Sequence, residues 1–177
     1  MTSPSSTVPL RRAVERALTQ PTGQTRALSH ARLFTLTFPA EVVYRPELTI
    51  ERKCCYVECY GHRDAVGVLE VGPVVREIVG VRVACWYYAG SELMRDEHER
   101  ALRELDEDRL LVRAALCYPG VLLYDPDGND TGLDGGSLRA DEWTSDGPTP
   151  LPATEGQARV LRVVHSFRTT VELTQPT

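Results

Sequence analysis

The sequence lacks two features that would place the chain in or across a membrane. No run approaches the roughly 20 consecutive apolar residues that span a bilayer. The first residues, MTSPSSTVPLRR, contain no apolar segment after their charges, as a signal peptide would. We therefore expect no membrane partner and a protein that is made and kept in a cytoplasm-like compartment.

Basic residues are too few for an ordinary nucleic-acid-binding domain. The 177 residues include 20 lysines and arginines against 25 aspartates and glutamates, which gives a formal net charge of −5. A surface that binds nucleic acid usually shows itself as a basic excess on the domain. We expect no specific nucleic-acid partner, although this composition leaves room for a local basic patch.

Cysteine is sparse and odd in number, which argues against a framework of disulfides. The five cysteines are Cys54, Cys55, Cys59, Cys85 and Cys117. Their neighbours are mostly hydrophobic, so we interpret them as reduced core residues. The stretch CCYVEC resembles a thiolate cluster, but no second pair of metal ligands follows it elsewhere. We expect no bound metal.

No catalytic signature stands out. The sequence contains neither GxGxxG nor GxxxxGK, and its four histidines are scattered. His62, Arg63 and Asp64 form the most suggestive group, since an imidazole beside an arginine and an aspartate can perform acid-base chemistry. The same three residues are typical of a polar turn after a strand. We expect no enzyme and no cofactor, and an enzymatic site at this group stays open as an alternative.

His165 lies inside a predicted strand. We interpret it as a satisfied residue at a sheet edge or an interface rather than as a catalytic group.

The segment DPDGNDTGLDGG resembles the first half of an EF-hand loop. Asp125, Asp127 and Asn129 occupy the first, third and fifth ligand positions, but the sixth position is Asp130 instead of glycine and the twelfth is Gly136 instead of glutamate. The preceding VLLYD is typical of a strand, whereas an EF-hand loop follows a helix. We interpret the segment as a solvated connection that contains Asx-turns, and we expect no calcium site.

Hydrophobic periodicity predicts a single α+β domain over residues 1–177, with a flexible N-terminus at 1–7. A short amphipathic helix follows, with Thr7 as its cap and Pro9 in its first turn, and it ends before Pro21. Residues 91–117 form a second, central helical segment, which the acidic residues 106–108 could divide.

Alternation with a period of two predicts the strands. They cover residues 32–38, 53–61, 77–88, 121–125 and 158–174. The segment between two of these strands, residues 61–73, is short and contains glycine, which favours an antiparallel connection over a helical crossover. We therefore expect a mostly antiparallel sheet packed by the two helical segments.

Residues 126–156 read as an extended loop insertion before the last strand. The segment is rich in proline, glycine and acidic residues, and it has too few apolar residues to bury itself. Trp143 and Leu151 are nevertheless unfavourable in water, so we expect the segment to dock on a neighbour together with the polar loop at 61–70. The candidate interface residues are His62, Arg63, Asp64, Trp143 and Leu151.

The order of these elements resembles that of the tail terminator, or tail-completion, proteins of long-tailed bacteriophages. The stretches that carry the resemblance are VECYGHRD, REIVGVRVACWYYAG, ERALRELDEDRLLVRAAL and the terminal VHSFRTTVELTQP. Members of that family are small α/β proteins with a mostly antiparallel sheet packed by helices. The resemblance lies in this pattern rather than in invariant residues.

The resemblance implies a structural virion protein. Such proteins assemble in the host cytoplasm and form a ring, usually a hexamer, on the last ring of tail tube protein at the head-proximal end of the tail. The ring ends tube growth and presents a surface to the head-tail connector. A head-completion or connector protein of the same particle, and a small ligand-binding regulatory α/β module, are the alternatives.

Overall fold

A computed structural model describes residues 4–20, 34–39, 42, 53–61, 74–89, 95–151 and 160–174. The helices are α1 (Val8–Thr19) and α4 (Arg95–Cys117), with short 3-10 turns at η2 (Asp134–Gly136) and η3 (Ala140–Glu142). The strands are β1 (Thr35–Leu36), β2 (Cys54–Gly61), β3 (Val74–Tyr88), β4 (Trp143–Ser145), β5 (Thr149–Pro150) and β6 (Val160–Thr174). The α+β class predicted from the sequence is confirmed.

The strands form one six-stranded, mostly antiparallel sheet. Its order is β1-β2-β3-β6-β4, with β5 also paired to β6, and among the described strand pairs only β1–β2 is parallel. The long strands β3 and β6 pair along their full length, from Val74 opposite Thr174 to Tyr88 opposite Val160. The predicted antiparallel pairing of β2 with β3 is confirmed.

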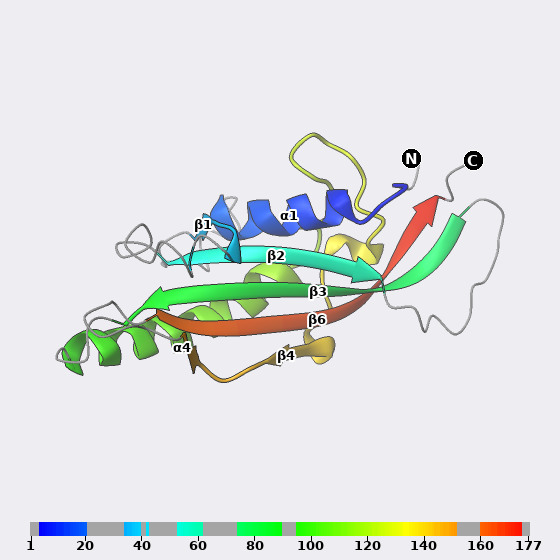
Figure 1. The fold of residues 1–177 in the computed structure, drawn as a ribbon. Coiled ribbons are helices and arrows are strands. Elements are labelled where there is room, and N and C mark those ends of the chain that lie inside the picture. Colours follow the sequence, from blue (N-terminus) through cyan, green and yellow to red (C-terminus); the bar gives the residue numbers. More distant parts are fainter. Residues whose placement is uncertain are drawn as a thin grey trace.

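Both helices pack on the same face of the sheet. In Figure 1, α1 runs along β2 while α4 crosses behind β3 and β6. Side chains alternate along a strand, so the odd-numbered residues of β2, β3 and β6 point toward the helices. Val57, Val83 and His165 lie side by side across these strands, and none of them is exposed to solvent. The odd-numbered residues of these three strands therefore form the core face of the sheet.

The helix α1 begins and ends where the sequence predicted. Its buried residues are Leu10, Ala13, Val14, Ala17 and Leu18. The side chain of Thr7, however, makes no capping hydrogen bond.

The helix α4 is continuous through residues 106–108, where a break was conceivable. Asp108 belongs to the buried stripe of the helix instead of interrupting it. The strand predicted at 32–38 is reduced to the two residues of β1 among those described, and Leu36 and Phe38 are exposed.

The strand predicted at 121–125 is wrong. The chain turns there, and only Tyr124 forms an isolated bridge, with Asp130. Side chains take the backbone oxygens that a neighbouring strand would need: the Thr131 hydroxyl donates to the Leu122 oxygen at 2.6 Å, and Arg16 donates to the Tyr124 oxygen at 2.7 Å.

The described part of the predicted loop insertion, residues 126–151, is attached to the sheet. It contains η2, η3, β4 and β5, and both Leu133 and Leu138 are buried in the main core. The expectation that the segment cannot bury its apolar residues without a neighbour is therefore wrong for these two leucines. Residues 152–156 lie outside the described part of the chain.

Close backbone approach explains how this segment reaches the sheet. The Glu172 amide donates to the Gly132 oxygen at 2.7 Å, and Gly132 has a φ of +73°. A Cβ at position 132 would meet the Glu172 oxygen at 2.3 Å. Only glycine allows both the positive φ and this contact.

Candidate interaction surface

The face of the sheet that points away from α1 and α4 is the candidate interaction surface, called here the outer face. It is formed by the even-numbered residues of β2, β3 and β6. Its partly or fully exposed side chains are those of Tyr56, Glu58, Tyr60, Arg76, Ile78, Arg82, Ala84, Tyr88, Arg162, Val164, Ser166, Arg168, Thr170 and Glu172.

One end of the outer face is covered by other parts of the chain. Val42, Cys54, Trp86 and Val160 form a second small core there, and Leu151 packs against it. The other end is open to solvent, since Glu58 and Arg82 keep 45% and 49% of their side-chain area exposed. The open end of the outer face therefore remains accessible to a partner.

Arginine dominates the charge of the outer face. Arg82 lies 3.7 Å from Glu58 and stacks over the Tyr60 ring, while Arg76 and Glu172 approach to 2.8 Å. The other two charged side chains of the outer face, Arg162 and Arg168, are both basic and belong to β6.

Arg162 and Arg168 on β6 are exposed and have no carboxylate partner within the described part of the chain. The described outer face thus holds four arginines and two glutamates, although the whole chain is acidic. Basic residues therefore outnumber acidic ones on this face, with Arg162 and Arg168 at separate positions along β6.

The structure separates the two predicted interface residues that it describes. Trp143 lies on the helix side of the sheet, where its ring centroid is 6.2 Å from that of His165 and 6.4 Å from that of Phe167. The guanidinium of Arg113 lies 5.1 Å from the Trp143 ring centroid. Trp143 therefore already has partners within its own chain, whereas Leu151 packs on the outer face.

The other predicted interface residues, His62, Arg63 and Asp64, lie outside the described residues. The interpretation of His165 as a satisfied edge residue is wrong. His165 is fully buried in a central strand, and neither ring nitrogen has a hydrogen-bond partner among the described residues.

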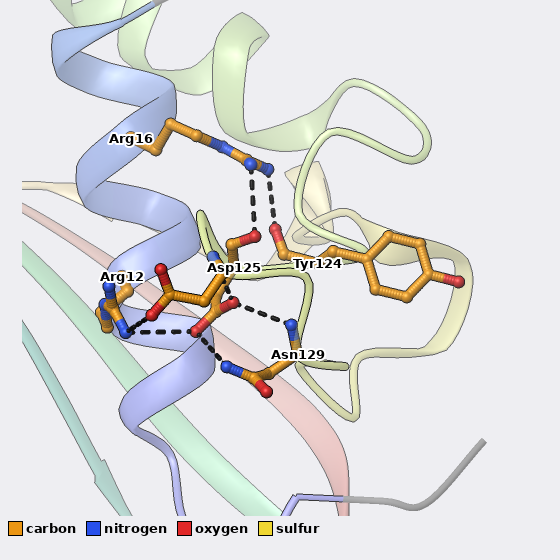
Figure 2. A network of polar contacts seen from close by, with 6 residues as sticks. Arg12, Arg16, Tyr124, Asp125 and Asn129 are labelled. Atoms are coloured by element: carbon orange, nitrogen blue, oxygen red, sulfur yellow. Dashed lines mark hydrogen bonds and ion pairs between the residues drawn. The ribbon is translucent and has the colours of Figure 1, made fainter.

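The aspartate-rich loop is organised by its own backbone and by α1 (Figure 2). One Asp125 carboxylate oxygen accepts hydrogen bonds from the amides of Asp127 and Asn129, at 2.9 and 2.8 Å, and the other accepts from Asn129 Nδ2 at 3.0 Å. The first of these bonds closes an Asx-turn, as predicted from the sequence.

Arginine side chains of α1 neutralise this loop. The Arg12 guanidinium lies 2.6 Å from Asp127 and 3.5 Å from Asp125, so a fixed cation of the protein stands against both carboxylates. Burial raises the pKa of Asp125, but the hydrogen bonds from Asn129 and Asp127 outweigh burial and leave this pKa below its ordinary value. The loop that contains Asp125, Asp127 and Asn129 therefore joins α1 to the start of residues 126–151, and we call it the clasp.

A second charged group is closed off from solvent. The Lys53 ammonium donates to both oxygens of Asp108 and lies 5.1 Å from the Phe34 ring centroid. Burial raises the pKa of Asp108, while the hydrogen bond from Lys53 acts in the opposite direction. No substrate can reach a pair whose side chains are only 6% and 3% exposed, so its role is structural.

Sequence reasoning missed this pair, although two signals were present. Lys53 continues the odd-numbered alternation of β2, and Asp108 continues the helical spacing of Leu105 and Val112. Each of these buried patterns therefore contains one charged residue, and the two charges are opposite, which indicates an ion pair in the core.

Among the described residues, no three His, Cys, Asp or Glu side chains are arranged to hold a metal ion. No helix in this part of the chain is both long and apolar enough to cross a membrane.

Comparison of the sequence with protein-family models gave no match, and comparison with curated protein sequences gave none either.

Proposed function

We propose that this chain is a non-enzymatic structural protein that assembles into a closed ring, in the manner of the tail terminators of long-tailed bacteriophages. The observation that carries the proposal is the open outer face, where arginines outnumber glutamates, on a sheet whose other face packs against the two helices. In this role the ring caps the tail tube protein and offers its opposite side to the head-tail connector.

A closed ring needs two unlike surfaces on each subunit. One surface of a subunit meets a different surface of the next, and the rotation closes on itself. The outer face supplies the first surface. The second must differ from it in charge, because complementary potentials set the register of an interface.

The region around β4 meets this requirement. Glu142 and Asp146 flank β4 and are exposed, and β4 is the last strand at its edge of the described sheet. We call these two residues the β4 rim. The proposed ring contact places the β4 rim of one subunit against Arg162 and Arg168 of the next.

Charge reversal tests this contact. Arg162→Glu with Arg168→Glu should abolish assembly, and so should Glu142→Lys with Asp146→Lys, because each puts like charges together. Combining all four changes should restore assembly. Arg100→Glu, on an exposed part of α4, is the matched control and should leave assembly unchanged.

The experiment also separates the contact from the function. If each of the two double variants, taken alone, still forms the ring normally, this contact is rejected while the ring itself is retained. A protein that never assembles, alone or with tail tube protein, would reject the function itself.

A further inference from the structure

Two cysteines face each other in the centre of the fold. Cys55 on β2 lies directly opposite Cys85 on β3, and the side chains of both are fully buried on the helix side of the sheet. Among the described strand pairs, this is the one position at which cysteine meets cysteine. The structure shows both residues as free thiols.

The hydrogen-bond pattern shows which kind of strand pair this is. The Cys55 oxygen accepts a hydrogen bond from the Thr37 amide at 3.0 Å, so the backbone groups of Cys55 point to the β1 side and away from β3. Cys55 and Cys85 are therefore a non-hydrogen-bonded pair of an antiparallel ladder, the type in which facing side chains come closest.

This geometry is close to that of a disulfide. Facing residues of such a pair have Cα atoms about 4.5 Å apart, within the range of about 4.4 to 6.8 Å that disulfides span. Facing Cβ atoms are about 4.5 to 5.5 Å apart, against about 3.5 to 4.5 Å in a disulfide. A small approach of the two strands is enough to join the sulfur atoms.

The surroundings keep both thiols reduced and slow to react. Burial raises the pKa of Cys55 to about 12 and that of Cys85 well above its ordinary value, and the Cys55 thiol adds to the shift of the Cys85 pKa. Because the thiolate is the reactive form, an oxidant can attack only during transient opening of the strand pair.

The other cysteines cannot take the place of either partner. Cys54 points to the outer face opposite Trp86, and Cys59 lies opposite Val81. Cys117 ends the helix α4 and faces neither Cys55 nor Cys85 across a described strand pair.

We propose that Cys55 and Cys85 close a cross-strand disulfide when the protein meets a low-molecular-weight disulfide such as oxidised glutathione. One cysteine thiolate attacks the oxidant and releases one glutathione thiolate. The second cysteine thiolate attacks the mixed disulfide and releases the other. Two protein thiols are oxidised, one oxidant disulfide is reduced, and the two protons end on the two glutathione molecules.

The bond would fasten β2 to β3 and restrict the unfolded chain, so it should raise the melting temperature. Cross-strand bonds at such sites are strained, and strained disulfides are the easily reduced ones. The pair would thus respond reversibly to the redox state of its surroundings. This inference does not depend on the ring-forming function.

The test incubates the purified protein with oxidised glutathione, unfolds it in urea and counts free thiols. The count should fall from five to three, and peptide mapping without reductant should join the peptides of Cys55 and Cys85. The protein should lose the mass of two hydrogen atoms and melt at a higher temperature, and reductant should reverse both changes.

Variants identify the partners. Cys85→Ala should remove the cross-link and the rise in melting temperature, whereas the matched control Cys54→Ala should keep both. If Cys85→Ala does not fold, the peptide maps of the unaltered protein and of Cys54→Ala still show which cysteines are joined. Five thiols remaining after oxidation, or a cross-link between other cysteines or between two chains, would overturn the proposal.

Discussion

The Lys53 ammonium group donates to both carboxylate oxygens of Asp108, at 2.7 and 2.6 Å, and so joins the start of β2 to the middle of α4. Both side chains are almost completely buried. Removing one partner of such a pair leaves the other charge without compensation in the core, which is more damaging than the loss of the attraction itself.

We expect Asp108→Ala to lower the free energy of unfolding by about 3 to 5 kcal/mol, because the Lys53 ammonium is then buried alone. Urea denaturation measures the change. The matched control, Glu172→Ala, breaks the exposed pair with Arg76 and should cost less than about 1 kcal/mol. Equal effects of the two variants would contradict the structural role assigned to the buried pair.

Acid should destabilise the protein through His165. Burial, and then the charge of Arg109, lower the pKa of His165 to about 4, while Asp146 acts in the opposite direction. The unfolded chain, with an ordinary histidine pKa near about 6.5, binds the proton more readily than the folded protein. This contribution to stability is present above about pH 6.5 and is lost as the pH falls toward about 4; it amounts to roughly 3 kcal/mol.

Urea denaturation between pH 7 and pH 4 measures this loss. Carboxylates titrate over part of the same range, so the informative quantity is the difference between the protein and His165→Phe, which keeps a ring against Trp143. We expect the variant to lose less stability on acidification. Parallel pH profiles of the two proteins would show that His165 contributes nothing to the acid sensitivity.

The clasp at Asp125 should stabilise the fold by its hydrogen bonds. Asp125→Ala removes an acceptor of three hydrogen bonds and should lower the free energy of unfolding by about 1 to 3 kcal/mol. Asp127→Ala, whose side chain is 60% exposed, is the control and should have a smaller effect. The reverse order of the two effects would show that the Arg12–Asp127 bond, rather than the turn, holds the clasp.

We expect calcium to leave the melting temperature unchanged. The oxygens of Asp125 are already occupied by backbone amides and Asn129, and Arg12 stands against both carboxylates. Specific binding to the folded state would raise the melting temperature with increasing calcium concentration. A calcium-dependent rise that Asp127→Ala removes would contradict this expectation.

The long strands and their core face could be predicted because local alternation decides them. Val57 and Val83 each belong to a clear alternation of period two. Shifting either strand by one residue would turn its apolar side chains away from the core, so burial of one face fixes the register of the strand pair. Residues 121–151 could not be predicted in the same way. Their backbone bonds go to distant partners, such as the Leu138 amide that donates to the Leu116 oxygen, and no local pattern encodes such partners.

The candidate surface was only partly visible in the sequence. The alternation in β6 already places Arg162 and Arg168 on one side of a strand. The overall acidic charge gave no sign that arginines would outnumber glutamates on the described outer face. Trp143 was selected as an interface anchor because the sequence gave no sign that β4 would bring it against His165 and Phe167.

The mass of the assembly in solution tests the central claim most directly. Static light scattering behind a sizing column, over a range of protein concentrations and with and without tail tube protein, measures this mass without a label. The proposed function predicts one discrete, closed assembly of several 19.7 kDa subunits, six for a hexamer, either alone or on the tube protein. A 19.7 kDa monomer under every one of these conditions would contradict it.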